Sequence, residues 1–182
     1  MTDLDNKRVA LIASLAQINP GKGRTALMKL CYFLQTLRRA PLEYHFTLYS
    51  YGPFDSDVLA DLDTAEALGA VQASVSYYPG GYGYEIRPAG QCESAKQLAA
   101  GFLNRHETDI DWVIAEFGGL DAADLELTST IVYIDREALS AQERLQNEAL
   151  VQRVRDVKPH FTEEQVRDQV RDLNEKNILT LT

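Results

Sequence analysis

Cysteine and histidine are scarce in this chain of 182 residues, which holds two cysteines and three histidines. Cys31 and Cys92 show no CxxC spacing, and Cys31 lies in the apolar run ALMKLCYFL, where a thiol acts as a small hydrophobic group. A disulfide framework is therefore not expected, which fits a reducing cytoplasm. His45, His106 and His160 stand alone, without HExxH or a Cys/His cluster, so no zinc site is predicted.

Long hydrophobic runs and catalytic motifs are also missing. No stretch approaches the roughly 18 consecutive apolar residues of a membrane-spanning helix. The first residues, MTDLDNKRVALIASLAQ, are acidic before they are apolar, unlike a signal peptide. No GxSxG motif is present, and no Ser-His-Asp set follows from the spacing. We therefore expect a cytoplasmic protein that binds no membrane, is not an enzyme, and has no catalytic residues, metal or cofactor.

Positive charge is outnumbered, because 18 Lys and Arg residues face 27 Asp and Glu residues, for a formal net charge of −9. Such a charge repels phosphate backbones at long range unless a local basic patch offsets it. It also steers basic partners toward the protein.

Helical spacing dominates the first half of the chain. Apolar residues recur at three-residue steps in the first segment, at Val9, Ile12, Leu15 and Ile18. The run NPGKGR interrupts this helix, and a second is expected over about residues 25–39. A third, capped by Asp55 or Ser56 and ended by Gly69, is expected to reach about residue 68.

Extended segments separate and follow these helices. Residues 42–51, LEYHFTLYSY, are aromatic and β-prone, and Gly52-Pro53 is expected to turn the chain after them. Alternation sends Tyr49 and Tyr51 to the same side, partly into the core. Residues 71–87 alternate around PGG, which predicts a β-hairpin. Three helices followed by a hairpin is the element order of a winged helix.

The second half of the chain is expected to be helical. A helix or helix pair is predicted over about residues 93–117, with a break near His106. A helix buried on two sides is predicted after GGLD, and another over about residues 142–157. The last helix is predicted to open with the capping-box pair Thr162 and Gln165. The predicted fold class is therefore mainly α with a small β-hairpin. A winged-helix-like half, residues 1–92, would pack on a helical half, residues 93–182, as one integral domain.

The acidic third helix argues against DNA binding. A winged-helix DNA binder usually presents basic and polar groups there, with a basic wing on the phosphates. Residues 55–68 hold no Lys or Arg, and the wing offers only Arg87. Tyrosine gives large contact area at low entropy cost, so this surface suits a protein partner. The predicted partner-binding residues are Tyr51, Asp57, Asp61, Tyr78, Tyr82 and Arg87.

The segment PGKGRT, residues 20–25, has two interpretations. Its glycines and the cations Lys22 and Arg24 precede a helix N-terminus, the geometry that binds phosphate. The P-loop spacing GxxxxGK[ST] is absent, and an ordinary turn between helices is the alternative.

Two stretches resemble a known family. The family is the Panacea (SocA-like) antitoxin domain. Its KL-x-YF helix resembles TALMKLCYFLQ, through Lys29, Leu30, Tyr32 and Phe33. Its Gly-Pro segment resembles YSYGPFDSDVLADLDTAEALGAV. The uncharacterised bacterial YwgA-like proteins are more similar still, with the same YGP, DLD helix, hairpin and closing helix pair. The tryptophan often found before Gly-Pro is Tyr51 here, which favours the YwgA-like branch.

The resemblance implies an antitoxin- or adaptor-like protein, whose partner would be a toxin or a protease substrate. Together with the residues above, it makes a non-enzymatic protein-binding module the leading hypothesis. The alternative is a transcriptional regulator that binds DNA as a dimer, with Lys22, Arg24 and Arg87 in contact with the DNA backbone. An enzyme would require a pocket of convergent polar groups, which no motif indicates.

Overall fold

A computed structural model describes residues 1–78 and 81–181, without the side chain of Tyr78. The chain forms two compact units: residues 1–47 with 54–120, and residues 48–53 with 121–182. The predicted boundary at residues 92 and 93 falls inside the first unit. The PGG turn lies partly outside the described residues.

The predicted fold class is confirmed, since the chain is mainly α with two small antiparallel strand pairs. The first unit contains α1 (Asp3–Ile18), α2 (Arg24–Arg38), α3 (Ser56–Ala67), β3 (Val71–Tyr78), β4 (Gly81–Pro88), α4 (Cys92–Gln97), α5 (Ala100–Arg105) and α6 (Glu107–Phe117). The second contains α7 (Ala122–Ser140), α8 (Asn147–Val157) and α9 (Glu163–Glu175). A second hairpin, β1 (Thr47–Tyr49) and β2 (Gly52–Phe54), has its tip in the second unit. Among the described residues, no helix is long and apolar enough to cross a membrane.

Helix α1 is the centre of the first unit. Residues 8–16 are all buried, because the helix packs against α3, α4, α5 and both strands of the β3–β4 hairpin. Ile18, expected on the buried face, is exposed because it is the last residue of the helix. Helix α2 packs on α6, where the rings of Phe33 and Phe117 stack with centroids 4.0 Å apart.

Local signals place α3 as predicted. Asp55 caps the helix by accepting a hydrogen bond from the Asp57 N–H at 2.9 Å. Gly69 ends the turn with φ +69°, a conformation that glycine adopts without strain. The N–H of Ala70 then donates to Ala65 O, and the chain enters β3.

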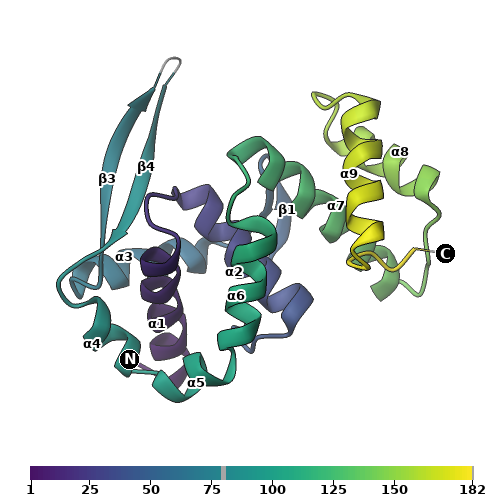
Figure 1. Cartoon of the computed structure of the whole chain (residues 1–182). Helices are drawn as coiled ribbons and strands as arrows, with labels where there is room; N and C mark the ends of the chain where they lie inside the picture. The colour runs from purple at the N-terminus through teal and green to yellow at the C-terminus, as the bar shows by residue number, and fades with distance from the viewer. Residues whose placement is uncertain (79–80, 182) are drawn as a thin grey trace. The chain divides into compact units, whose positions relative to one another are not determined.

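The β3–β4 hairpin projects from the helices of its unit (Figure 1). Its base is held by a third extended segment, the loop between α1 and α2. Gly21 N–H donates to Ile86 O at 2.8 Å, and Ile86 N–H donates to Lys22 O at 2.9 Å. A Cβ at Gly23 would lie 2.9 Å from Tyr84 O, so only glycine permits this close approach. The loop therefore extends the hairpin at its base.

In the second unit α7 is one long helix, as predicted, with residues 125–132 all buried. Helix α9 begins with the predicted capping box of Thr162 and Gln165. Helix α8 begins at Asn147, five residues later than the predicted start at Gln142. Gln142 has φ +60°, and the Glu143 N–H closes the end of α7 by donating to Ala138 O.

The tip of the β1–β2 hairpin corrects two predictions. The turn lies at Ser50 and Tyr51, and Gly52 and Pro53 belong to strand β2. Tyr49 and Tyr51 are exposed rather than partly in the core, because a two-residue turn leaves both rings at the hairpin tip. Gly52 has φ +86°, and a Cβ there would lie 2.9 Å from Ser129 Oγ and 3.2 Å from Thr130 Oγ1.

A buried ion pair holds the same tip within the second unit. Lys158 Nζ lies 2.9 Å from Glu126 Oε1 and donates to the carbonyl oxygens of Tyr49 and Ser50. His160 Nε2 lies 3.2 Å from the same Glu126 oxygen, and its ring is half exposed. The lysine thereby ties the backbone of the turn to α7 through Glu126.

Candidate functional site

The strand register gives the β3–β4 hairpin one apolar face. Tyr77 lies opposite Tyr82, Val75 opposite Tyr84, and Ala73 opposite Ile86. Residues directly opposite each other share a face, and alternate residues along a strand share it too. These six side chains therefore form one stripe, named here the tyrosine face: Ala73, Val75, Tyr77, Tyr82, Tyr84 and Ile86.

The tyrosine face is buried at its base and exposed toward its tip. Ile86 is buried against the helices, whereas Tyr77 is 81% exposed and Tyr82 is 61% exposed. The ring centroids of Tyr77 and Tyr82 are 6.5 Å apart, and those of Tyr82 and Tyr84 are 6.3 Å apart. Three rings thus follow one another along the face, at separations typical of aromatic pairs.

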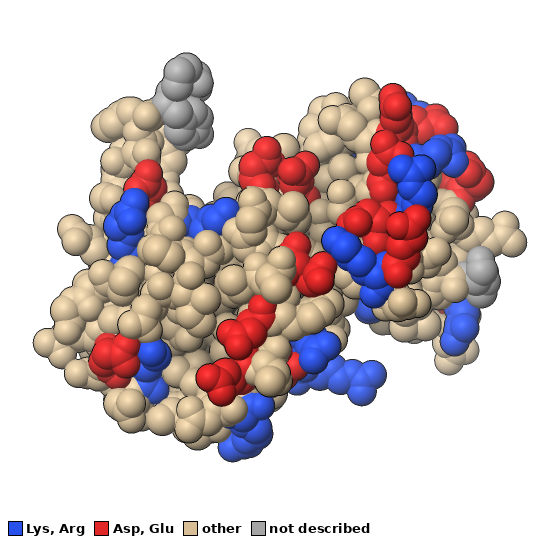
Figure 2. Space-filling view, in the orientation of Figure 1, with Lys and Arg blue, Asp and Glu red and all other residues tan. Residues whose placement is uncertain are grey.

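The opposite face of the hairpin is polar. It carries Gln72 opposite Arg87 and Ser74 opposite Glu85. Arg87 Nη2 lies 3.0 Å from Glu85 Oε2, so this charge is matched on its own strand. In Figure 2 most of the hairpin surface in view is uncharged, with a basic and an acidic group side by side on it. The hairpin is amphipathic, with its outer apolar half in solvent.

The two cations of the loop between α1 and α2 make contacts inside the first unit. Lys22 Nζ donates to Leu120 O at 3.2 Å. The guanidinium carbon of Arg24 lies 3.8 Å from the ring centroid of Tyr84, a cation–π contact. These contacts, with the Gly21 N–H bonded to Ile86 O, fit the interpretation as a turn between helices. The anion contact stays a prediction.

Only part of the acidic helix α3 faces solvent. The Asp57 side chain is half exposed and lies 3.7 Å from Arg8 Nη1. Asp61 is only 13% exposed, accepts a hydrogen bond from Tyr44 Oη at 2.9 Å, and lies 3.6 Å from Arg8 Nη1. Burial raises the pKa of the Asp61 carboxyl, against the lowering effect of Tyr44 and Arg8. Asp61 is therefore part of the interior of the unit.

The Asp61 environment is a polar cluster within the core. Arg8, itself buried, donates to the carbonyl oxygens of Leu42 and Glu43 at 2.7 and 2.8 Å. Its guanidinium carbon lies 4.2 Å from the Tyr44 ring centroid. Beside this cluster, burial raises the pKa of the Cys31 thiol to about 12. The cluster fixes the segment between α2 and β1 against α1 and α3.

The predicted partner-binding residues are distributed over both units. Tyr51, 70% exposed, belongs to the second unit. Asp57, Tyr82 and Arg87 are exposed in the first unit, and the Tyr78 side chain lies outside the description. Of these residues, the structure places Tyr82 on the tyrosine face and Arg87 on the polar face.

The predicted partner-binding residues did not include Tyr77 or Val75. Their alternation in VQASVSYY was the signal, since residues two apart share a face. Which tyrosine pairs with Tyr82 depends on the register, and PGG does not fix the register because it can form turns of different length.

Known proteins give no further guidance on the site. No protein-family model matches the chain, and no match is found among the curated proteins. The resemblance to YwgA-like and Panacea proteins thus stays a prediction. In residues 1–78 and 81–181, no group of three or more His, Cys, Asp or Glu side chains could hold a metal ion.

Proposed function

We propose that this protein is a non-enzymatic cytoplasmic binding module that contacts a protein partner through the tyrosine face of the β3–β4 hairpin. The observation that carries the proposal is the exposure of Tyr77 and Tyr82 as adjacent rings on an anchored hairpin. Asp57 on α3 adds an exposed carboxylate that suits a basic partner. An antitoxin- or adaptor-like role, as the resemblance implies, is the form of this function that we favour.

Preorganisation supports this proposal. The base of the hairpin is fixed by two backbone hydrogen bonds to the loop between α1 and α2 and by Arg24 on Tyr84. A fixed hairpin loses little conformational freedom on binding, so more of its contact energy remains as affinity. Tyrosine has few rotatable bonds and a large ring, which is why it is common at protein interfaces.

The DNA-binding alternative has less support. Its proposed backbone contacts Lys22 and Arg24 already make intramolecular contacts, and Arg87 is paired with Glu85. The net charge of −9 adds long-range repulsion from phosphate.

The test is affinity capture from the protein's own cytoplasm with quantitative mass spectrometry and a nucleic-acid assay on the same eluate. Tyr77→Ser with Tyr82→Ser removes the exposed rings, and Ser74→Ala with Glu85→Gln alters only the polar face as a matched control. Circular dichroism checks that both variants fold. We expect a stoichiometric protein that the control retains and the tyrosine variant loses. Equal capture by both variants, or recovery of nucleic acid alone, would refute the proposal.

A further inference from the structure

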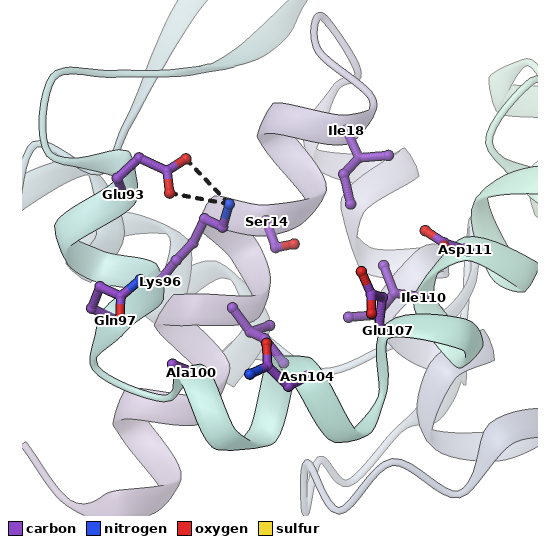
Figure 3. Close-up of a pocket in the computed structure, with 11 residues that line it drawn as sticks. Ser14, Ile18, Glu93, Lys96, Gln97, Ala100, Asn104, Glu107, Ile110 and Asp111 are labelled. Carbon is purple, nitrogen blue, oxygen red and sulfur yellow. Dashed lines mark hydrogen bonds and ion pairs between the residues drawn. The ribbon is translucent and has the colours of Figure 1, made fainter.

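A trough in the first unit lies between the end of α1 and the helices α4, α5 and α6. Its volume is about 270 Å³, enough for one side chain or a small ligand. Ile18, Leu103 and Ile110 supply its apolar surface. Figure 3 shows that Ser14 and Ile18 on α1 border the trough on one side, with Glu107 and Asp111 on α6 across from them.

The one lysine of the trough is already neutralised. Lys96 Nζ lies 3.2 Å from Glu93 Oε1 and donates to Gln17 Oε1 at 2.6 Å. Hydrogen bonds donated by Gln17 Nε2, at 2.7 Å, and by Lys96 lower the pKa of the Glu93 carboxyl. Figure 3 shows the Lys96 side chain turned toward Glu93 and away from Glu107. The lysine therefore adds no net charge to the opposite wall.

Two carboxylates on that opposite wall are unmatched. Glu107 and Asp111 are one helical turn apart on α6, so their side chains leave the same face about 6 Å apart. Among the described residues neither has an ion pair, whereas Asp109 on another face of α6 is paired with Arg38 at 2.8 Å. The trough thus carries local negative charge beside apolar surface.

Ser14 adds a polar group at the bottom of the trough. The residue is only 6% exposed, yet it lines the trough. Within the described part of the chain, its hydroxyl has no hydrogen-bond partner. Because the hydroxyl is open to the trough, a ligand there can bond it directly.

We propose that this trough binds an alkyl chain that ends in a guanidinium or ammonium group. The apolar surface would contact the methylene groups, while Glu107, Asp111 and the Ser14 hydroxyl would receive the cationic end. An arginine or lysine side chain of a peptide has this chemistry, and so does a free alkyl amine. The site is separate from the tyrosine face, and the inference does not depend on the proposed function.

The test uses three probes in isothermal titration and ¹⁵N NMR with the full chain. They are acetyl-Gly-Arg-Gly-amide, its citrulline analogue of nearly the same shape but without charge, and agmatine. We expect saturable binding of a charged probe, with chemical-shift changes confined to residues 14–18 and 93–111. Binding should weaken with added salt, because the carboxylates are exposed. Peptide binding assigns the site to a side chain, and binding of agmatine alone assigns it to a free amine.

Variants test the residues. Glu107→Gln with Asp111→Asn should weaken binding at least about fivefold, since each exposed charge contact contributes a modest amount. Asp63→Asn with Glu164→Gln removes the same charge elsewhere and should change affinity less than about twofold. Ala100→Leu narrows the trough and should abolish binding while the spectrum of the remaining chain is kept. Equal binding of the citrulline peptide, or equal effects of the two double variants, would overturn the inference, as would absence of binding by both charged probes.

Discussion

The guanidinium of Arg24 lies over the ring of Tyr84, 3.8 Å from its centroid, and so joins the start of α2 to strand β4. Arg24→Ala should loosen the base of the hairpin by about 1 kcal/mol, the usual contribution of such a contact. Hydrogen exchange of the Ile86 amide, which donates to Lys22 O, reports this directly. Arg105→Ala, at an exposed arginine of α5, is the control and should leave that exchange rate unchanged.

Removal of the buried Arg8 should destabilise the first unit strongly. Arg8→Ala leaves Asp61 buried without its cation and the Leu42 carbonyl without its donor. Loss of one partner of a buried pair costs about 3 kcal/mol or more. The neighbouring Lys7→Ala breaks only an i,i+4 pair with Asp3 and should cost less than about 0.5 kcal/mol. Equal midpoints in urea unfolding for the two variants would contradict the buried role of Arg8.

Stability should fall as pH rises from about 9 toward 12. Burial raises the pKa of the Cys31 thiol to about 12 and also raises that of the Tyr44 hydroxyl. Because the folded pKa values exceed the unfolded ones, the folded state keeps protons that the unfolded chain releases. The resulting stability is complete below the unfolded pKa values and is lost through this range.

Cys31→Ala with Tyr44→Phe should flatten that alkaline decline, measured as the free energy of urea unfolding against pH. The double variant is less stable at pH 7, so the slope rather than the absolute value is compared. A wild-type slope retained in the variant would assign the alkaline loss to other groups.

Gly52→Ala should destabilise the second unit by about 2 kcal/mol, since it combines a positive φ with overpacking. The new methyl group would lie 2.9 Å from Ser129 Oγ. Gly119→Ala meets no atom within 4 Å and serves as the control. Amide hydrogen exchange in α7 and α9 should be faster in Gly52→Ala and unchanged in Gly119→Ala. Unchanged protection in Gly52→Ala would show that the tip can shift without cost.

The buried pair of Lys158 and Glu126 gives a further prediction. Lys158→Met leaves the carboxylate uncompensated and should cost about 3 kcal/mol, and Glu126→Gln in the same chain should restore part of this. Arg171→Met breaks an exposed pair with Asp168 and should cost less than about 1 kcal/mol. If the double variant is no more stable than Lys158→Met alone, the uncompensated Glu126 carboxylate is not the cause of the lost stability.

Local signals predicted most elements of this fold. Asp55, Gly69 and the Thr162–Gln165 pair mark helix ends through contacts within a few residues, which a sequence displays directly. The turn at Ser50 and Tyr51 was missed because Gly52 adopts its conformation against Ser129, a contact far along the chain. A Gly-Pro pair by itself predicts a turn, but here packing against Ser129 places Gly52 and Pro53 in strand β2.

The candidate site was only partly predictable for the same reason. Tyr82 was identified from composition, but its neighbour Tyr77 follows from the register of the strands. Asp61 was predicted to belong to an acidic surface, because the local sequence of α3 displays its carboxylates. That sequence does not reveal that Arg8 and Tyr44 contact Asp61 in the folded chain. The trough beside α6 could not be predicted, since it combines residues from four helices whose packing no local pattern encodes.

The discontinuity of the second unit has a consequence for synthesis on the ribosome. Tyr49 emerges 109 residues before Lys158, the side chain that bonds its carbonyl. At about 5–20 residues per second, the tip of the β1–β2 hairpin waits roughly 5–20 s for that partner. During this interval the carbonyl oxygens of Tyr49 and Ser50 lack the Lys158 ammonium group that holds them in the folded unit, and the tip depends on solvent or a chaperone instead.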